Sequence, residues 1–366
     1  MLHRRTFSFF FFITTTLVLM TFTSSHSLAH SIAISSRSMA DMERFSNAGR
    51  GSNITGISEF KRYLWRFGYL DHNVNTTCNC FSDEFDAMLE SALVRYQRKL
   101  GLQVTGKLDS ITISEMITPR CGVPDSNDHT HTHTHMHSAK NFVYFPGKPR
   151  WSGPMPTTLT YAFSPEYTIH TLTLRQIRRA FRRAFTRWSN VIPLTFVESD
   201  DYGFAEIKIG FYSGDHGDGE AFDGVLGVLA HSFSPESGRL HLDAAETWAV
   251  DFGESWSEVA VDLESVATHE IGHVLGLSHS SVREAVMYPS LRPREKRYRL
   301  HIDDVMGVQS LYGSNPHFRS SDISSLQSAI SANHAPPRFP PFSILLSCAY
   351  LLSFFIIFSR GYKHVT

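Results

Sequence analysis

Residues 269–279 carry the side chains best suited to catalysis, in the order His-Glu-Ile-Gly-His-Val-Leu-Gly-Leu-Ser-His. On a helix, His269 and His273 project from one face, so both can bind one metal ion. Gly276 can turn the chain without a Cβ penalty, which brings His279 back as a third ligand. Three protein ligands leave a fourth position for water, and this open arrangement is typical of a catalytic zinc.

Glu270 follows the first of these ligands, where its carboxylate can accept a proton from water. Zinc lowers the pKa of bound water toward about 7 and polarises a carbonyl oxygen, so this site could cleave a peptide bond. The alternative is a helix with surface histidines, but a chance match to the whole spacing occurs only about once in a million start positions. Met287 lies within Ala285–Pro289 and could form a hydrophobic floor under the imidazoles; otherwise it is an ordinary core residue.

The composition indicates a globular protein and argues against a nucleic-acid partner. The chain has 366 residues, of which 42% are hydrophobic and 19% are charged, and its net charge is −1. A nucleic-acid binder usually carries a basic excess. The length suggests two domains with additional segments. Four cysteines are too few for a fold built on disulfides.

Two regions of the chain are expected to fold and to position the candidate metal ligands and Glu270. Residues 57–118 are predicted to form a small helical unit, and residues 145–313 are predicted to form an α+β domain. The helices are expected over Ser58–Phe67, Asp83–Leu100, from about Asp109 to before Pro119, and over Thr173–Asn190, Leu263–Gly276 and Ile302–Tyr312. The strands are expected over Leu159–Phe163, Leu194–Glu198, Glu206–Phe211, Gly227–His231 and Leu240–Asp243.

A polar stretch separates the two regions, and its Thr-His alternation at 129–137 cannot bury a core face. We interpret it as an exposed linker, although a His-rich tract could also bind metal loosely. The arginines of the 173–190 helix lie opposite its apolar face by the helical period. They therefore indicate a solvated face rather than a nucleic-acid patch.

The long zinc signature with Met287 resembles the metzincin metallopeptidases. Pro119–Asp125 (Pro-Arg-Cys-Gly-Val-Pro-Asp) resembles the cysteine switch of one metzincin family, the matrix metalloproteinases or matrixins. The resemblance implies that Cys121 fills the fourth zinc position in a latent form, with Arg120 and Asp125 paired to hold the loop. The alternative is a free or disulfide-bonded cysteine, but Cys121 has no evident partner.

The same resemblance implies two further metal sites in the second region. The family has a structural zinc and an adjoining calcium, so we expect two zinc ions and at least one Ca²⁺. The loop after Ser234 is shorter than in animal members, which puts a second calcium in doubt. The structural zinc ligands would be His216, Asp218, His231 and His241, and the calcium ligands would be Asp223, Gly224, Asp243 and Glu246.

The resemblance also implies a fold and a domain order. The catalytic domain would have a twisted five-stranded sheet and three helices, and it would follow a small helical propeptide domain. No hemopexin-like domain is expected, as in the plant type. The expected segments are a signal peptide (1–29), a propeptide segment (30–56), a peptidoglycan-binding-like prodomain with the switch (57–124), a His-rich linker and activation region (125–144), the catalytic domain (145–313), a polar, Pro-rich spacer (314–341) and an apolar tail (342–366).

Matrixins bind substrate beside the zinc, and three parts of this chain would contribute to that site. Gly227–Leu229 would pair with an extended peptide as an edge strand. Ser265 and a wall over Pro289–Leu291 would form an apolar pocket for the residue after the cut. A small Ser265 suggests a deep pocket that takes leucine-like side chains.

Apolar segments lie near both ends of the sequence. Arg4 and Arg5 precede an apolar stretch over 7–22, which is the layout of a signal peptide, although an uncleaved anchor is the alternative. Near the other end, small residues, a Pro-rich spacer and the apolar run 342–358 resemble a glycosylphosphatidylinositol (GPI) attachment signal. Ser331 or Asn333 would carry the lipid; the alternative is a single transmembrane helix. The sequons at Asn53 and Asn75 suit a secreted glycoprotein, but such triplets also occur by chance.

The sequence therefore predicts a monomeric, membrane-anchored zinc endopeptidase made as a zymogen and acting on extracellular proteins. Two other classes have to be considered. A catalytically dead zinc-binding module would commonly lose the base, whereas Glu270 is present. A His-rich metal buffer would need neither Glu270 nor Met287 nor Cys121.

The nature of the anchor can be tested directly. A GPI anchor predicts that phosphatidylinositol-specific phospholipase C releases the protein from intact cells, because that enzyme cleaves the lipid from its glycan. Release is measured by immunoblot of the medium. A chain that stays on the cells after this treatment would support the transmembrane alternative.

Overall fold

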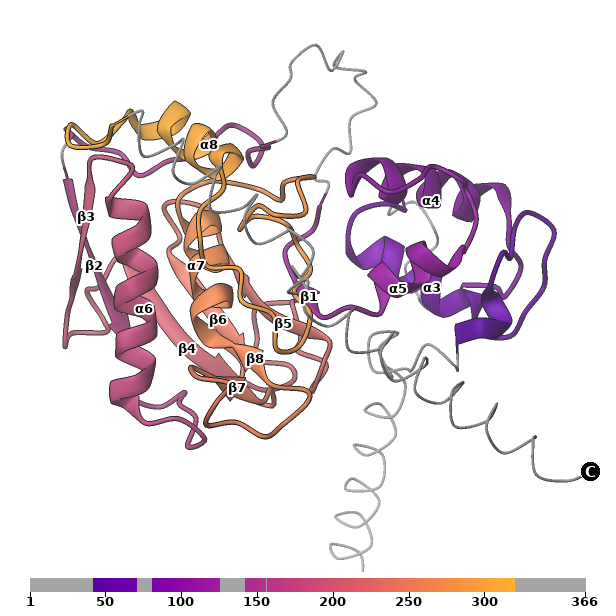
Figure 1. Cartoon of the computed structure of the whole chain (residues 1–366), viewed down its shortest axis with the longest axis horizontal. Helices are drawn as coiled ribbons and strands as arrows, with labels where there is room; N and C mark the ends of the chain where they lie inside the picture. The colour runs from indigo at the N-terminus through magenta and orange to yellow at the C-terminus, as the bar shows by residue number, and fades with distance from the viewer. Residues whose placement is uncertain (1–41, 71–80, 126–141, 156, 320–366) are drawn as a thin grey trace, which may run out of the picture. The chain divides into compact units, whose positions relative to one another are not determined.

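The computed structural model describes residues 42–70, 81–125, 142–155 and 157–319, which belong to one compact unit (Figure 1). Within these ranges, no helix is both long and apolar enough to cross a membrane. Several predicted features lie outside the described residues: both apolar end segments, the tract at 129–137, and Asn75, Ser331 and Asn333.

The N-terminal region contains the three expected helices. Its helix starts follow local capping, since Asp86 accepts the Leu89 N–H at 2.8 Å and Asp109 accepts the Thr112 N–H at 2.8 Å. On the second helix, Leu89, Ala92, Leu93 and Tyr96 are buried, whereas Met88 is 44% exposed. The elements are a short 3₁₀-helix, η2 (Glu43–Phe45), and the α-helices α3 (Ile57–Arg66), α4 (Ala87–Lys99) and α5 (Ser110–Met116).

The catalytic region has a mixed sheet with the strand order β1-β5-β6-β4-β2-β3. Five of these strands are the predicted ones, and the sixth, β1 (Arg120–Cys121), comes from the switch segment. A separate two-stranded sheet pairs β7 (Trp248–Ala249) with β8 (Val261–Asp262). The five remaining strands of the large sheet are β2 (Thr157–Phe163), β3 (Leu194–Glu198), β4 (Ile207–Tyr212), β5 (Val228–Ser232) and β6 (Arg239–Asp243).

Strand direction changes at one edge of this sheet. The pairs β2–β3, β2–β4 and β4–β6 are parallel, whereas β5 runs antiparallel to β6. The β5–β6 register places His231 directly opposite His241. Because directly opposed residues point to the same face of a sheet, this register brings two predicted zinc ligands together.

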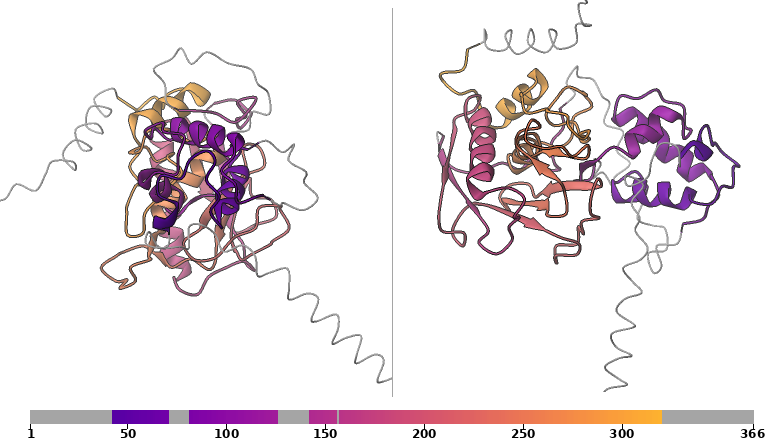
Figure 2. Two further views of the ribbon diagram at one scale, coloured as in Figure 1. Left: turned by 90° about the vertical axis from the view of Figure 1, so that its right-hand side faces the viewer. Right: turned by 60° about the horizontal axis from the view of Figure 1, so that its bottom comes forward.

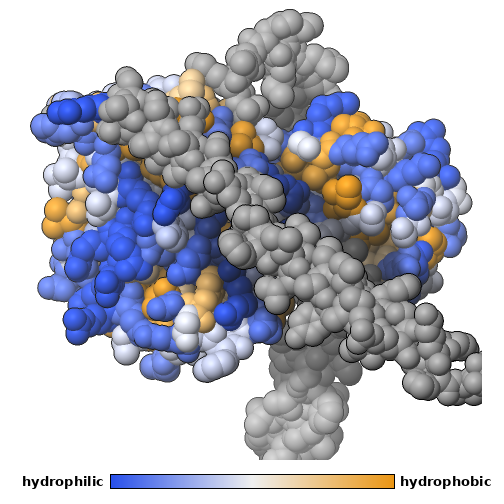
Figure 3. All heavy atoms as spheres, in the orientation of Figure 1, coloured by the Kyte–Doolittle hydropathy of each residue, from blue (hydrophilic) through white to orange (hydrophobic). Residues whose placement is uncertain are grey.

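Two long helices, α6 (Leu174–Ser189) and α7 (Leu263–Val274), pack on one another beside the sheet (Figures 1 and 2). Trp188 is fully buried between them and donates from its indole N–H to the Thr268 carbonyl at 2.9 Å. Leu174, the first residue of α6, is 46% exposed. The outer side of α6 carries the arginines, and Figure 3 shows a mainly hydrophilic surface over it.

The third catalytic helix, α8 (Ile302–Tyr312), supports the turn that contains Met287. The buried Asp304 carboxylate accepts N–H groups from Val286 at 2.9 Å, Met287 at 3.0 Å and His301 at 2.7 Å. One side chain in the first turn of α8 therefore fixes the backbone beneath α7. The expected α+β domain with a helical propeptide domain is confirmed.

Candidate metal centres

Helix α7 and the turn after it present the three candidate ligands of the first site. Asp262 caps the start of the helix and accepts the Ser265 N–H at 2.9 Å, and the ligand-bearing turns are buried. Gly276 ends this segment with φ of +101°, and a Cβ there would lie 2.2 Å from the Pro149 carbonyl oxygen. Glycine is therefore required both for the turn and for the close approach, as the sequence predicted.

The first cluster consists of Cys121, His269, His273 and His279, whose donor atoms all lie within 4.8 Å of one another. His273 Nε2 is 3.4 Å from Cys121 Sγ and 3.2 Å from His279 Nε2. A tetrahedral zinc holds nitrogen ligands roughly 3.3 Å apart. His269 Nε2 is buried and has no hydrogen-bond partner among the described residues. The donor set and its spacing therefore fit a zinc ion.

Hydrogen bonds on the outer side of the rings fix the tautomer of each histidine. The Nδ1–H of His269 donates to the Val286 carbonyl at 2.6 Å, and that of His273 donates to the Leu277 carbonyl at 2.8 Å. His279 Nδ1 lies 2.6 Å from the Asp125 carboxylate. Carbonyl and carboxylate oxygens can only accept, so each Nε2 keeps its lone pair for a metal.

The electrostatics of this cluster also favour a cation. Burial lowers the pKa of all three imidazoles, which therefore stay neutral. Burial raises the pKa of the Cys121 thiol well above its usual range, and the nearby Glu270 charge raises it further. A cation among the four donors is what would hold the sulfur as a thiolate.

Glu270 is fully buried beside these ligands. Burial raises the pKa of its carboxyl to about 7, against the opposing effect of the Ser232 and Cys121 side chains. Both carboxylate oxygens lack a hydrogen-bond partner among the described residues. An unpaired carboxylate at a metal centre is suited to take up and return a proton.

Met287 is buried against the ligand-bearing helix. A Cβ on Gly272 would lie 2.2 Å from its sulfur, so the absence of a side chain at Gly272 leaves room for Met287 under α7. A floor under the imidazoles stays a prediction.

The switch segment occupies the cleft between β5 and the 289–291 wall. The Cys121 N–H donates to the Pro289 carbonyl at 2.9 Å, and the Gly122 N–H donates to the Ala230 carbonyl at 2.8 Å. A Cβ on Gly122 would lie 2.6 Å from a Val228 methyl, so glycine permits this approach. Strand β1 thus covers the edge that the sequence assigned to substrate.

Arg120 and Asp125 form the ion pair expected of the switch, at 2.7 Å and with both side chains almost fully buried. Asp125 also accepts the Tyr69 hydroxyl at 2.8 Å. Burial alone would raise the pKa of Asp125, but the Arg120 charge and the His279 hydrogen bond outweigh burial and lower it. The Arg120 guanidinium stacks 3.6 Å above the Phe67 ring, which ties the loop to the helical unit.

The second cluster consists of His216, Asp218, His231 and His241. The Asp218 Oδ2 atom lies 2.9 Å from His216 Nε2 and 2.8 Å from both His231 Nε2 and His241 Nδ1. Burial lowers the pKa of His231 and His241 to about 4, so both are neutral. Four donors without an open position fit a structural zinc.

The predicted calcium ligands lie beside this cluster. Asp223 accepts the Val228 N–H at 2.7 Å, and Asp243 accepts the Gly224 N–H at 3.1 Å. Burial raises the pKa of Asp243 to about 6 and of Glu246 to about 8, and neighbouring carboxylates add to both shifts. In the described part of the chain, these carboxylates are not among the tight donor groups, so calcium stays a prediction.

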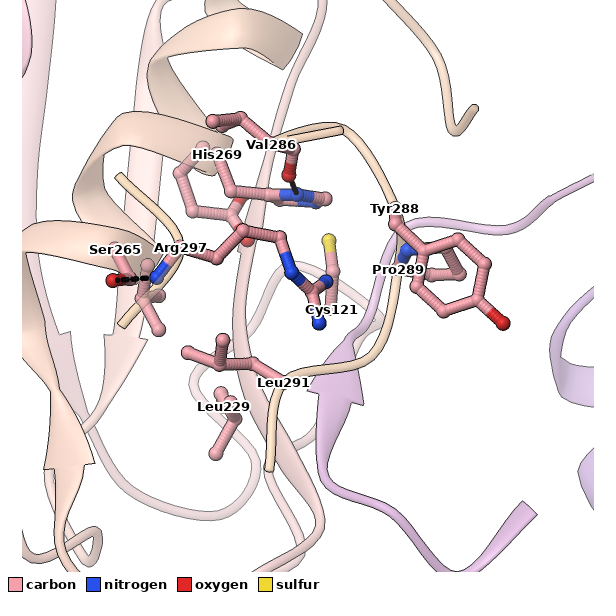
Figure 4. Close-up of a pocket in the computed structure, with 11 residues that line it drawn as sticks. Cys121, Leu229, Ser265, His269, Val286, Tyr288, Pro289, Leu291 and Arg297 are labelled. Carbon is pink, nitrogen blue, oxygen red and sulfur yellow. Dashed lines mark hydrogen bonds between the residues drawn. The ribbon is translucent and has the colours of Figure 1, made fainter. Parts of the chain in front are cut away.

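A pocket opens beside the catalytic cluster and contains a residue that the sequence analysis missed (Figure 4). Figure 4 shows Arg297 extending across the pocket between Ser265 and Cys121. The Arg297 N–H donates to the Ser265 hydroxyl at 2.8 Å, and its guanidinium donates to the Ser290 carbonyl at 2.7 Å. Ser265 in turn donates to Asp262 at 2.6 Å. The Ser265 hydroxyl is therefore engaged in hydrogen bonds on both sides, and the Arg297 backbone lies against it.

No pattern in the sequence distinguishes Arg297 as a pocket residue, because it is one of five basic residues within 292–299. The sequence analysis also missed the outer partners Val286, Leu277 and Asp125. It likewise missed Asp304, which holds the Val286 backbone. For Asp304, a buried position at a helix start next to the methionine turn could have been suspected from its spacing. Of the sequons, Asn53 is exposed.

The chain is similar to known protein families along much of its length. Residues 150–313 match the family model described as Matrixin, and residues 54–116 match a putative peptidoglycan binding domain. Metalloendoproteinase 4-MMP of Arabidopsis thaliana is 58% identical over 279 residues, 76% of this chain and 78% of that protein. Metalloendoproteinase 1-MMP of the same plant is 52% identical over 309 residues, which cover 84% of this chain and 83% of that protein. Human neutrophil collagenase is 42% identical over 230 residues, which cover 61% of this chain and 44% of that protein.

If the second cluster binds zinc, the protein should hold two zinc ions per chain. His231→Ala should lose one of two bound zinc ions and lower the thermal unfolding temperature, because a closed zinc site contributes directly to folding. Elemental analysis and thermal unfolding measure the two effects. His170→Ala changes an exposed histidine outside both clusters and serves as the control. Two zinc ions retained by His231→Ala would contradict the assignment.

Proposed function

The chain belongs to the matrixin family of zinc metalloendopeptidases, and on that premise we propose that it is a latent precursor with Cys121 as the blocking ligand and Glu270 as the general base. The observation that carries this proposal is the convergence of the Cys121 sulfur and three neutral imidazoles next to an unpaired carboxylate. The same zinc position cannot hold both the sulfur and a reacting water.

Catalysis requires a protein base beside the metal. Bound zinc supplies a Lewis acid that activates water and polarises the scissile carbonyl. Glu270 takes a proton from the attacking water and passes it to the departing amide nitrogen. Glu270 has no hydrogen-bond partner among the described residues, which leaves both oxygens available.

The edge of β5 and the pocket define the expected substrate. An extended peptide would add to β5 in the place of β1, using main-chain hydrogen bonds, and the pocket would take the side chain after the cut. Apolar residues line most of this pocket, and we infer that the Arg297 side chain, which also lines it, limits its size. Medium-length apolar side chains such as leucine therefore fit best, in extended segments of extracellular proteins.

We propose a location for the enzyme from the two apolar segments near the ends of the sequence. The N-terminal apolar segment supports secretion, and the C-terminal segment supports attachment to the outer face of the plasma membrane. A lipid at Ser331 or Asn333 is the favoured anchor, with a single membrane span as the alternative. The exposed position of Asn53 is compatible with glycosylation.

The base has a direct test. In a Cys121→Ser chain, Glu270→Ala should lower peptide cleavage about a thousandfold while zinc stays bound, because the proton acceptor is lost and the ligands remain. A quenched fluorescent peptide reports activity, and elemental analysis reports zinc. Glu254→Ala removes an exposed carboxylate and should leave activity unchanged. Substantial activity in Glu270→Ala would overturn the mechanism.

Latency can be tested on the full chain. Cys121→Ser should cleave the same peptide without an activation step, because a serine hydroxyl is a far weaker zinc ligand than a thiolate. Cleavage is followed at the earliest time after purification, beside the wild-type chain. The double variant Cys121→Ser, Glu270→Ala controls for contaminating proteases. A Cys121→Ser chain that stays latent would argue against the switch.

Arg297 predicts a change in specificity. In the Cys121→Ser chain, Arg297→Ala should raise kcat/KM for a peptide with phenylalanine after the cut about tenfold relative to leucine, since removing the guanidinium deepens the pocket. Two peptides that differ only at that residue give this ratio. Arg299→Ala, an exposed arginine of the same loop, is the matched control. Equal ratios in the two variants would refute this role.

A further inference from the structure

The three ligand histidines of the catalytic cluster differ in where their outer hydrogen bonds come from. The partners of His269 and His273 are the Val286 and Leu277 carbonyls, which belong to the same catalytic region. The partner of His279 is the Asp125 side chain, at 2.6 Å, from the switch segment 154 residues earlier. One ligand is therefore oriented by the propeptide and not by its own domain.

The Asp125 carboxylate is fixed independently of His279. Its Oδ2 accepts the Tyr69 hydroxyl at 2.8 Å, and its Oδ1 accepts the Arg120 guanidinium at 2.7 Å. Its own backbone N–H donates to the Phe67 carbonyl at 3.1 Å. The side chain is fully buried, like that of His279. Oδ1 is thus held in place, with a lone pair directed at the His279 ring.

A carboxylate that accepts the outer N–H of a metal-bound imidazole orients the ring and makes its other nitrogen a stronger ligand. We propose that Asp125 is a positioning residue of the metal centre in the latent form, where it holds His279 on the zinc and slows zinc loss. This role is distinct from pairing with Arg120, although both groups donate to Oδ1, because only the His279 contact reaches a candidate metal ligand.

The proposal rests on the latent form proposed above and adds a consequence to it. Departure of the propeptide removes two contributions at once: the Cys121 sulfur and the charged partner of His279. The mature enzyme should then exchange zinc faster than loss of the thiolate alone explains. The propeptide would serve during secretion both to block the zinc and to retain it.

Zinc release to a chelating indicator tests this role in the full chain. All chains carry Glu270→Gln, which prevents self-cleavage, so that the readout is independent of activity. Asp125→Asn keeps the shape of the side chain and removes its charge, and it should release zinc about tenfold faster. Tyr69→Phe removes another Asp125 contact without touching His279, and it should change the release rate by less than about threefold.

The same comparison in a Cys121→Ser background separates Asp125 from the thiolate. Asp125→Asn should again accelerate release, because its effect passes through His279. Equal release rates for Asp125→Asn and Tyr69→Phe in both backgrounds would overturn the proposal. Failure of latency itself would appear differently, as an inactive Cys121→Ser chain with the native Glu270.

An NMR measurement remains informative if a variant is less stable. In the chain labelled with nitrogen-15 histidine, the imidazole N–H proton bonded to a carboxylate should resonate downfield of the two bonded to carbonyls. Asp125→Asn should shift that resonance upfield and leave the other two in place. If Asp125→Asn left the chemical shifts of all three resonances unchanged, the contact would be refuted.

Discussion

Three imidazoles can face one another in a buried space only if each has its Nδ1–H satisfied on the outside. Val286, Leu277 and Asp125 meet this requirement for His269, His273 and His279. The outer partners fix the rings so that every Nε2 lone pair points to one centre. Much of the surrounding structure supports these partners. The Asp304 carboxylate in α8, for example, holds the Val286 backbone.

Residues 120–125 make three kinds of contact within a few positions. Their backbone extends the sheet beside β5, their cysteine completes the donor set, and their aspartate supports a ligand. The Arg120 guanidinium, stacked on Phe67, joins all three to the helical unit. In the proposed latent form, release of that unit would therefore act on strand pairing, the fourth donor and ligand orientation together.

The two donor clusters are assembled in different ways. In the catalytic cluster, helical periodicity places two ligands and a glycine turn returns the third. In the second cluster, antiparallel register sets His231 against His241, and a loop adds His216 and Asp218. In the first arrangement the three histidines leave one side to Cys121, next to the pocket. The second is closed by protein donors, which suits a structural ion.

The sequence alone determined what depends on local spacing. The metal ligands on α7, Glu270, the donor set of the second cluster and nearly every helix and strand follow from period, capping residues and motif order. The tertiary structure decided which distant groups meet. Arg297 reaches the pocket from a loop of similar charges, β1 adds a strand to the sheet, and Asp125 reaches His279. These contacts depend on how the elements pack, and the spacing of residues along the chain does not determine that packing.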